Sequence, residues 1–269
     1  DFCLSRGLGD VYKRQVQTAA LPGVRLLVTV KNELSLERPS EMIVLASEDV
    51  LRSLQAEDLR RIRVSDMPSG AELLSQAIDL DGDSVPDQLV FQADFGPSQS
   101  RTFGLVVGTV RIPKREEFRV YGRFVRERFD DFAWENDRIA HRMYGTALET
   151  WVREPLTSSA VDVWCKRVRR LIVNEWYMVD NYHEDTGEGA DFYSAGRSRG
   201  CGGSGIWENG KLHVSRNFVG SRVLANGPIR LVFELIYAPW QAGGREVSEV
   251  KRITLDAGQN LNRFESYYK

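Results

Sequence analysis

The sequence predicts an all-β protein, an antiparallel β-sandwich with few short helices. Apolar segments of strand length recur along the whole chain, and turn-forming residues separate most of them. Asp-Gly and Asn-Gly pairs lie between several of these segments, which is the pattern of tight β-hairpins. Few windows have helical period, and no apolar run approaches the roughly 20 residues that a membrane helix needs. Many short strands joined by tight turns are typical of sandwiches of large antiparallel sheets.

The charge of the chain is nearly balanced, with 36 Lys and Arg against 38 Asp and Glu and a net charge of −2. This balance argues against a nucleic-acid partner and against binding to a membrane surface. A chain of 269 residues can bury one substantial core, so we expect a single domain over residues 16–269. Cys165 and Cys201 have no zinc-binding spacing, and they form either one disulfide or two free thiols.

The first fifteen residues are excluded from fold reasoning. Ser5–Gln15 reads SRGLGDVYKRQ, the translation of a transposase-type sequencing adaptor, whereas a genuine basic arm would require an eleven-residue coincidence. We therefore expect residues 1–15 to be disordered and the natural chain to begin near Val16. The pattern also stops within a strand at Lys269, so we expect truncation at both ends. The lack of an export signal carries no information in such a fragment.

The first half of the chain contains one helical turn among its expected strands. Val50, Leu51 and Leu54 share a face at helical spacing, which predicts a short helix over Glu48–Leu54. The expected strands are Arg25–Lys31, Met42–Ala46, Leu59–Val64, Leu74–Ile78, Leu89–Phe95 and Arg101–Val107.

An acidic loop, Asp79–Asp87, joins two of these strands. Its carboxylates are Asp79, Asp81, Asp83 and Asp87, and several hard oxygens in a tight turn are what Ca²⁺ binds. The position of its glycine and the absence of a glutamate at the end of the loop do not fit the EF-hand pattern. The preferred interpretation is an Asp-Gly hairpin turn between Leu74–Ile78 and Gln88–Ala93 that needs no metal, with a calcium site as the alternative.

In the second half, Arg119–Phe124 alternates apolar and polar residues as a half-buried strand does. Trp134–Tyr144 fits either an extended segment or a helix, and its pattern does not decide between them. Leu171–Met178 is expected to be a strong strand. Asn209-Gly210 predicts a hairpin between Gly205–Trp207 and Leu212–Ser215. Further strands are expected at Ile229–Tyr237, Val247–Leu255 and Leu261–Tyr268.

The candidate functional segment is the loop Tyr182–Gly205, which reads YHEDTGEGADFYSAGRSRGCGGSG. It concentrates a histidine, carboxylates, tyrosines, arginines and glycines within one stretch. Histidine, tyrosine and carboxylates together are the residues of acid–base catalysis, and loops held by a scaffold commonly carry such sites. The structural alternative is a long polar hairpin loop whose carboxylates are solvated.

Several long motifs resemble the bacterial domain-of-unknown-function family 4861. They are WENDR, RMYG, DVWCKR, YHEDTGEGADFY and GPIRLVFELIY, and the likeness covers nearly all of Val16–Lys269. The resemblance implies a galactose-mutarotase-like β-supersandwich and a periplasmic or secreted protein of bacteria that consume polysaccharides. It also implies activity on uronic-acid-containing oligosaccharides by elimination of water. An oligosaccharide is therefore the expected partner, and no cofactor is expected.

β-Elimination beside a carboxylate needs a base, an acid, and a cation or donor that stabilises the enolate-like intermediate. His183 is the base candidate because free imidazole titrates near neutral pH, and Tyr193 and Tyr144 are acid candidates. Arg138, Arg197 and Arg199 are candidates for binding the substrate carboxylate, because a guanidinium matches a carboxylate in shape. The candidates for binding the rest of the substrate are Glu188, Asp191 and Trp134. Each of these six residues also has a structural interpretation, as an ion pair or as core packing.

Two other function classes stay open at this point. A glycoside hydrolase would use a carboxylate pair such as Glu188 and Asp191. A non-catalytic carbohydrate-binding module would need only the aromatic residues and the polar loop. Elimination creates an ultraviolet-absorbing double bond, hydrolysis creates reducing ends without one, and a binding module creates neither.

Overall fold

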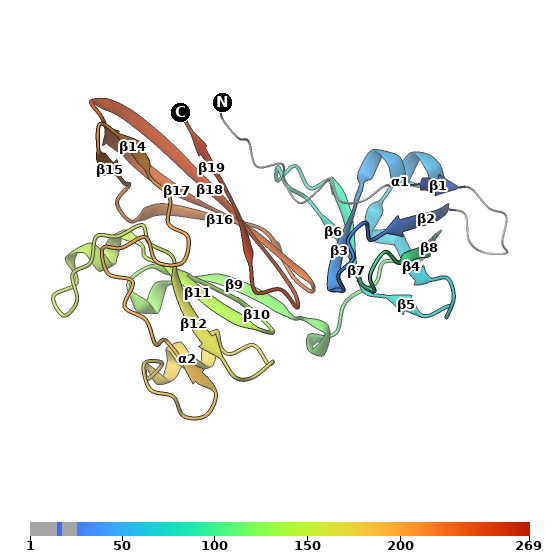
Figure 1. The fold of residues 1–269 in the computed structure, drawn as a ribbon, viewed down its shortest axis with the longest axis horizontal. Helices are drawn as coiled ribbons and strands as arrows, with labels where there is room; N and C mark the ends of the chain where they lie inside the picture. Colours follow the sequence, from blue (N-terminus) through green and yellow to red (C-terminus); the bar gives the residue numbers. More distant parts are fainter. Residues whose placement is uncertain (1–14, 18–25) are drawn as a thin grey trace. The chain divides into compact units, whose positions relative to one another are not determined.

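The computed structural model describes residues 15–17 and 26–269, and it divides into two compact units, Asp1–Pro113 and Lys114–Lys269. Both units are built from antiparallel sheets, which confirms the all-β prediction (Figure 1). Residues 1–14 of the expected adaptor segment lie outside the residues that the structure describes. A single domain over residues 16–269 stays a prediction.

The first unit consists of two sheets. The larger has the order β1-β2-β8-β4-β5, formed by Gln15–Gln17, Leu26–Lys31, Ser100–Val107, Ile62–Asp66 and Glu72–Leu73. The smaller has the order β3-β7-β6, formed by Arg38–Ala46, Gln88–Phe95 and Ser75–Ile78. One core contains buried residues of both sheets, and Phe91 of β7 meets Phe103 of β8 edge to face at 4.9 Å. The unit is therefore a small sandwich.

The short helix predicted in this unit is confirmed as α1, Ser47–Leu54. Val50 and Leu54 are buried on one face, and the helix ends at Gln55 in the left-handed conformation. The predicted hairpin around Asp79–Asp87 is also confirmed, because β6 and β7 pair antiparallel across it.

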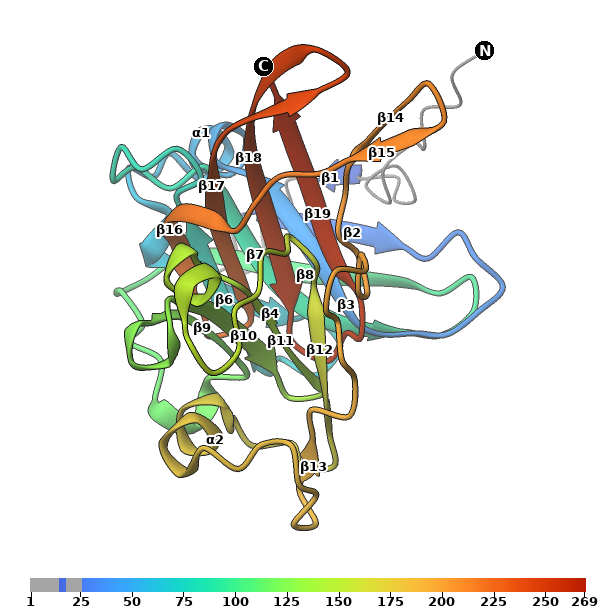
Figure 2. The same cartoon turned by 90° about the vertical axis from the view of Figure 1, so that its left-hand side faces the viewer.

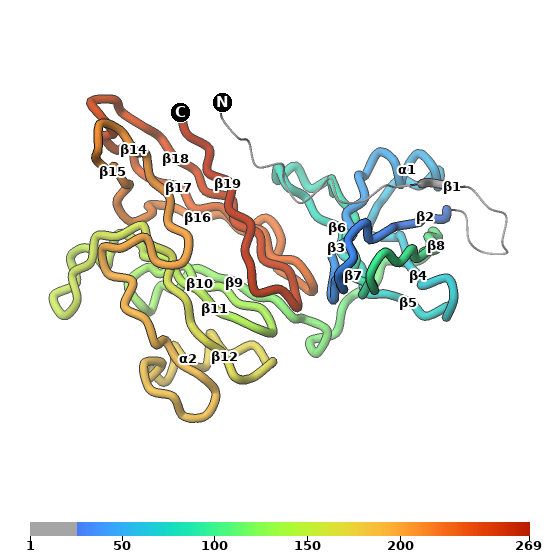
Figure 3. Tube along the Cα trace, viewed as in Figure 1, coloured from blue at the N-terminus to red at the C-terminus, as the bar shows by residue number. Residues whose placement is uncertain are grey.

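The second unit carries a five-stranded and a four-stranded sheet. The five-stranded sheet has the order β13-β12-β11-β10-β9, formed by Gly189–Ala190, Asp162–Lys166, Ile139–Met143, Asp131–Asn136 and Val120–Val125. The other sheet runs β16-β17-β18-β19, formed by Phe218–Asn226, Arg230–Ala242, Arg245–Asp256 and Asn262–Tyr268. Figure 2 shows these four strands side by side, and the tube in Figure 3 follows their meander. Phe132 of β10 stacks on Phe233 of β17 at 4.1 Å, which joins the two sheets in one core.

The Asn209-Gly210 hairpin is confirmed between β14, Ile206–Glu208, and β15, Lys211–His213. Both turn residues have positive φ, 50° and 77°, as a type I′ turn requires. Short 3₁₀ turns lie at Leu59–Arg61, Arg115–Glu117, Arg126–Arg128 and Thr146–Thr150. Cys165 and Cys201 are free. None of the described helices is long and apolar enough to cross a membrane, and the expected export stays a prediction.

The segment Trp134–Tyr144 is neither one strand nor a helix. Strand β10 ends at Asn136 and β11 begins at Ile139, with a tight turn between them. Asn136 fixes this turn, because its Oδ1 accepts hydrogen bonds from the backbone N–H groups of Arg138 (2.8 Å) and Ile139 (3.0 Å). A side chain hydrogen-bonded to the backbone two residues on is a recurrent turn device.

The prediction of a strand over Leu171–Met178 is wrong, because α2 spans Val173–Val179. Its apolar residues Val173, Trp176 and Tyr177 are buried at helical spacing. The deciding partner lies far away in the sequence: Glu135 of β10 accepts hydrogen bonds from the N–H groups of Ile172 and Val173, each at 2.7 Å. A buried carboxylate at these free amides favours a helix start, so a distant residue selects the helix.

Candidate functional site

A pocket of about 430 Å³ lies where β11 and β12 meet the loop Tyr182–Gly205. We call it the His183 pocket. Its wall is mainly polar on the strand side and mixed on the loop side. The lining residues are Arg142, Tyr144, Glu154, Pro155, Leu156, Asp162, His183, Asp191, Phe192, Tyr193, Ser194, Ala195 and Gly196.

The two strands place a cation and an acid side by side. Arg142 of β11 lies directly opposite Asp162 of β12 in the antiparallel register, so both side chains point to the same face. Arg142 Nε donates to Asp162 Oδ2 at 2.9 Å. Tyr144, two residues further along, donates its hydroxyl to the same oxygen at 3.1 Å.

Arg142 is the centre of a buried charge network. Its Nη2 donates to Asp191 Oδ2 (3.1 Å), its Nη1 donates to the Tyr182 hydroxyl (3.0 Å), and Asp131 Oδ2 lies 3.6 Å from Nη1. Three carboxylates thus surround one guanidinium within a buried region. Burying a charged group costs free energy unless an opposite charge lies beside it. Arg142 is therefore needed for the three carboxylates to stay buried.

Because three carboxyl groups are buried around one guanidinium, the pKa values of Asp191 and Asp131 rise toward neutral pH. Burial raises the pKa of Asp191 to about 6, although Arg142 acts to lower it. Burial likewise raises the pKa of Asp131 to about 7 against the nearby Arg142 and Arg128. Burial also raises the pKa of Tyr144 well above its usual range. Perturbed pKa values of groups in and beside a pocket are typical of candidate functional sites.

His183 stands at the mouth of the pocket. Its side chain is 59% exposed, and its Nδ1 lies 3.5 Å from Asp191 Oδ2. Its other ring nitrogen, Nε2, makes no hydrogen bond to any described residue. A histidine that faces a buried carboxylate with one nitrogen and solvent with its other side is arranged as a general base.

Glycines attach the loop to the edge of the sheet at two points. Gly189, in β13, pairs with Lys166 of β12, and a Cβ there would lie 2.0 Å from Cys165 O. Gly200 bridges to Val161, where a Cβ would lie 1.9 Å from the carbonyl oxygen. Both glycines have positive φ, 104° and 54°. Only glycine allows this close approach, so the glycines of the motif hold the functional loop in place.

The comparison with known families agrees with the motifs. The chain matches the family model described as "Domain of unknown function (DUF4861)" over residues 30–269. The chain belongs to this family. It is similar to "Uncharacterized protein P7" from Formosa agariphila, with 37% identity over 248 residues, 89% of this chain and 62% of the relative. The chain therefore spans less than two thirds of that relative's length. The galactose-mutarotase-like architecture stays a prediction.

Four of the residues predicted from the sequence of this DUF4861 member line the His183 pocket together. They are His183, Asp191, Tyr193 and Tyr144. His183 follows a helix rather than the strand that was expected before it. Tyr193 is 60% exposed, and Asp191 is buried. The loop thus supplies two exposed groups, His183 and Tyr193, and one buried carboxylate, Asp191.

The other predicted residues lie outside the lining of this pocket. Arg138 is in the turn at the far end of β11, and Arg197 is exposed on the loop. Arg199 donates to Ser159 Oγ at 3.0 Å. Glu188 pairs with Arg170 and accepts from Trp176 Nε1 at 3.4 Å. Trp134 is fully buried and stacks on His141 at 5.2 Å, so it is core packing and presents no face to a ligand.

Sequence reasoning missed Arg142, Asp162 and Asp131 as members of the site. Arg142 and Asp162 do lie in two of the DUF4861 motifs, RMYG and DVWCKR. A cation and an acid in separate motifs whose strands pair could have indicated the contact. Asp131 gives no such signal, because its contacts with Arg142 and with the Tyr177 hydroxyl (3.2 Å) depend on the folded network.

The acidic loop in the first unit is a well-bonded turn. Asp79 accepts backbone hydrogen bonds from Gly82 (2.6 Å) and Ser84 (2.7 Å), and Asp87 accepts one from Leu80 (2.6 Å). Asp79, Asp81 and Asp87 each bring one oxygen within 4.8 Å of the others, and Asp83 is not in this cluster. Backbone amides stabilise the Asp79 carboxylate, so closing the hairpin requires no metal.

Proposed function

We propose that the His183 pocket is the active site of an enzyme that acts on uronic-acid-containing oligosaccharides by β-elimination, as a dehydratase or lyase. The observation that carries this proposal is the position of His183. Its ring faces the buried Asp191, and the exposed Tyr193 lines the same pocket. A base with an orienting carboxylate and a neighbouring proton donor is the set of groups that elimination needs.

In the proposed reaction, His183 removes the proton from the carbon that bears the substrate carboxylate. Asp191 stabilises the resulting imidazolium across the 3.5 Å contact. The electron pair of the broken C–H bond forms the new C=C bond, and the C–O bond to the leaving oxygen breaks. Tyr193 donates the proton that this oxygen takes up. The products are an unsaturated uronate and either water or the released saccharide, whose leaving oxygen is now a hydroxyl group.

The substrate carboxylate must be stabilised while negative charge builds up on it, which is often the largest catalytic term. Arg142 is the guanidinium that lines this pocket. A guanidinium has five N–H donors. Hydrogen bonds to Asp162, Asp191 and Tyr182 use three of them, which leaves donors for the substrate. In this proposal Arg142 takes the role that the sequence pattern suggested for Arg138, Arg197 or Arg199.

The proposal is tested by incubating the protein with uronate oligosaccharides and following ultraviolet absorbance and product mass. His183→Ala should lower turnover by roughly a hundred- to ten-thousandfold, the usual contribution of general acid–base catalysis. Folding should be largely intact, because the side chain is mostly exposed. His213→Ala is the matched control, because His213 lies in β15 outside the pocket lining. Near-normal turnover of His183→Ala would show that His183 is structural.

One observation favours glycoside hydrolysis as a second candidate. Burial raises the pKa of Asp191 to about 6, as a general acid needs, and Asp162 is a second carboxylate in the same pocket. The same incubation separates the two reactions. Hydrolysis yields new reducing ends with the mass of added water and no ultraviolet-absorbing double bond.

A further inference from the structure

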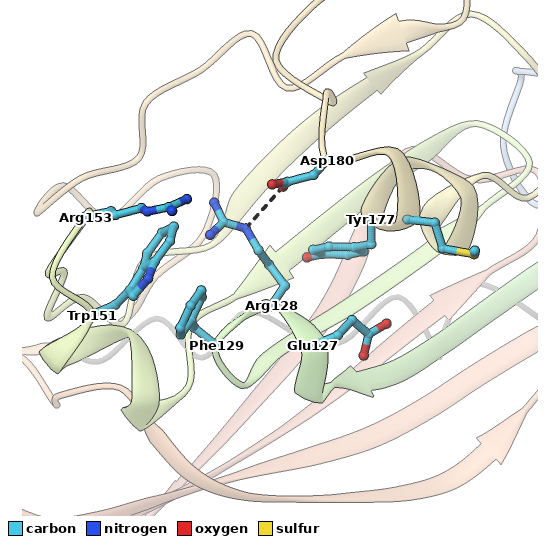
Figure 4. A pocket seen from close by; sticks show the side chains of 8 residues that line it. Glu127, Arg128, Phe129, Trp151, Arg153, Tyr177 and Asp180 are labelled. Carbon is cyan, nitrogen blue, oxygen red and sulfur yellow. Dashed lines mark ion pairs between the residues drawn. The ribbon is translucent and has the colours of Figure 1, made fainter.

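A second hollow, of about 540 Å³, lies in the same unit as the His183 pocket, and we call it the Trp151 pocket. Its size falls in the range of small-ligand sites. The lining side chains are basic, aromatic and acidic, and Figure 4 shows them around the hollow. They are Glu127, Arg128, Phe129, Trp151, Arg153, Tyr177, Met178 and Asp180.

Two guanidinium groups point into this hollow, as Figure 4 shows. Arg153 is exposed and makes no ion pair or hydrogen bond with the described residues. Arg128 is held in position, because its Nε donates to the Tyr182 hydroxyl at 2.6 Å. Its carboxylate contacts are loose, at 3.5 Å to Glu154 and 3.9 Å to Asp180. One fixed and one uncommitted guanidinium together form an anion-binding arrangement.

Aromatic rings form the adjoining wall. Phe129 and Trp151 stack with their centroids 4.0 Å apart, and the Arg128 guanidinium lies 4.6 Å from the Trp151 ring. This cation–π contact orients Arg128 toward the hollow without consuming its hydrogen-bond donors. Rigid aromatic groups beside guanidinium groups suit a ligand with an apolar ring face and an acidic substituent.

The acids of the Trp151 pocket do not cancel its basic groups. Glu127 is already bound by Arg123 from outside the hollow. Asp180 has a side chain that is 71% exposed and lies at the end of α2, so water screens its charge. Glu154 stands on the side of the His183 pocket. Within the lining, the two guanidinium groups therefore face one acid that no described residue outside the hollow binds, Asp180, and its contact with Arg128 is long at 3.9 Å.

Contacts between lining residues link the two pockets. The Tyr182 hydroxyl accepts hydrogen bonds from Arg128, which lines the Trp151 pocket, and from Arg142, which lines the His183 pocket. Glu154 lines the His183 pocket and pairs with Arg128. Glu154 also directly follows Arg153 of the Trp151 pocket in the chain, so the two linings come close together at this point.

We infer that the Trp151 pocket is a subsite for a second acidic sugar unit of the same oligosaccharide, whose carboxylate or sulfate ester binds Arg153 and Arg128. This inference rests on the proposed function of the His183 pocket, and it adds that the substrate carries acidic groups on neighbouring units. An anionic sugar with one acidic group would occupy only one of the two pockets.

The test measures binding rather than turnover. Calorimetric titrations use galacturonate, its dimer and its trimer, and a sulfated disaccharide with its unsulfated counterpart. The dimer or the sulfated disaccharide should bind the unaltered chain at least tenfold more tightly than the monomer or the unsulfated form. In Arg153→Gln this gain should fall by about five- to tenfold, the effect of one partly exposed charged hydrogen bond.

Arg245→Gln is the matched control, because Arg245 is an exposed arginine at the start of β18 and does not line either pocket. It should leave the gain unchanged. An equal loss of this gain in affinity in Arg153→Gln and Arg245→Gln would show a general charge effect and overturn the inference. The inference would also be overturned if ligands with two acidic groups bound no more tightly than ligands with one. A gain that depends on Arg153 without any product would support the subsite and refute the proposed reaction.

Discussion

Arg142→Gln is the substitution that tests the buried charge network most directly. The guanidinium contacts Asp162, Asp191 and Asp131, at 2.9, 3.1 and 3.6 Å. The glutamine keeps a polar side chain but removes the charge. Three buried carboxylates then share a region without their central cation. Leaving buried charges without a partner costs about 3–5 kcal/mol.

The loss should depend on pH, and its sign follows from the carboxyl groups. The pKa of Asp131 is raised by burial to about 7 and that of Asp191 to about 6, and Arg142 opposes both shifts. Without Arg142 both values rise further above those of the unfolded chain. The folded state then holds protons that the unfolded state releases, so stability falls as pH rises. The deficit of the variant should be large at pH 8 and clearly smaller at pH 5.

Urea unfolding followed by tryptophan fluorescence measures this deficit. All six tryptophans lie beyond residue 113, so the signal reports on the unit that carries the site. At a slope of about 2 kcal/mol per molar urea, a loss of about 4 kcal/mol moves the midpoint down by about 2 M. Arg216→Gln is the control: it breaks a pair with Glu149 whose arginine is 69% exposed, worth at most about 1 kcal/mol. Equal losses in the two variants at pH 8 would refute the reasoning.

Three further predictions concern other parts of the chain. Asp131→Asn should flatten the fall in urea midpoint between pH 5 and pH 8, because the pKa of about 7 comes from that carboxyl; an unchanged slope would contradict this. Calorimetric titration with Ca²⁺ should show no strong site at Asp79–Asp87, and saturable binding that Asp81→Ala abolishes would reverse this interpretation. Gly200→Ala should cost about 2–4 kcal/mol, because its Cβ meets a carbonyl oxygen at 1.9 Å. Gly196→Ala, also at positive φ but in open space, should cost only about 1 kcal/mol; equal costs in urea unfolding would show that the contact at Gly200 is unimportant.

The sequence predicted those parts of the fold that depend on nearby residues. The Asn209-Gly210 hairpin, the turn at Asp79–Asp87 and the helix over Glu48–Leu54 all follow from local turn chemistry or from spacing on one face. For the same reason the predicted strand Val247–Leu255 falls within β18, and Leu261–Tyr268 covers β19 with one extra residue at its start.

The errors arose where a distant residue decides the conformation or the contact. The apolar pattern of Leu171–Met178 predicts a strand, and the helix found there begins where the distant Glu135 accepts hydrogen bonds from backbone amides. Three residues of the predicted loop, His183, Asp191 and Tyr193, line one pocket. The cation beside them was not predicted, because Arg142 reaches Asp191 only through the pairing of β11 and β12. The sequence shows which charged side chains are present, but the register of paired strands determines which of these side chains come into contact.

The two glycine contacts fix both ends of the segment between them, so this segment can be exchanged as one unit. Gly189 and Gly200 bind it to the backbone of β12 and Val161, so its ends are defined by main-chain contacts. The residues that follow β13, from Asp191 to Arg199, contribute Asp191 and Tyr193 to the pocket and belong to no strand of the sheet. Exchange of this stretch can therefore alter the lining of the His183 pocket while the scaffold, and the buried Arg142 beneath it, stay the same.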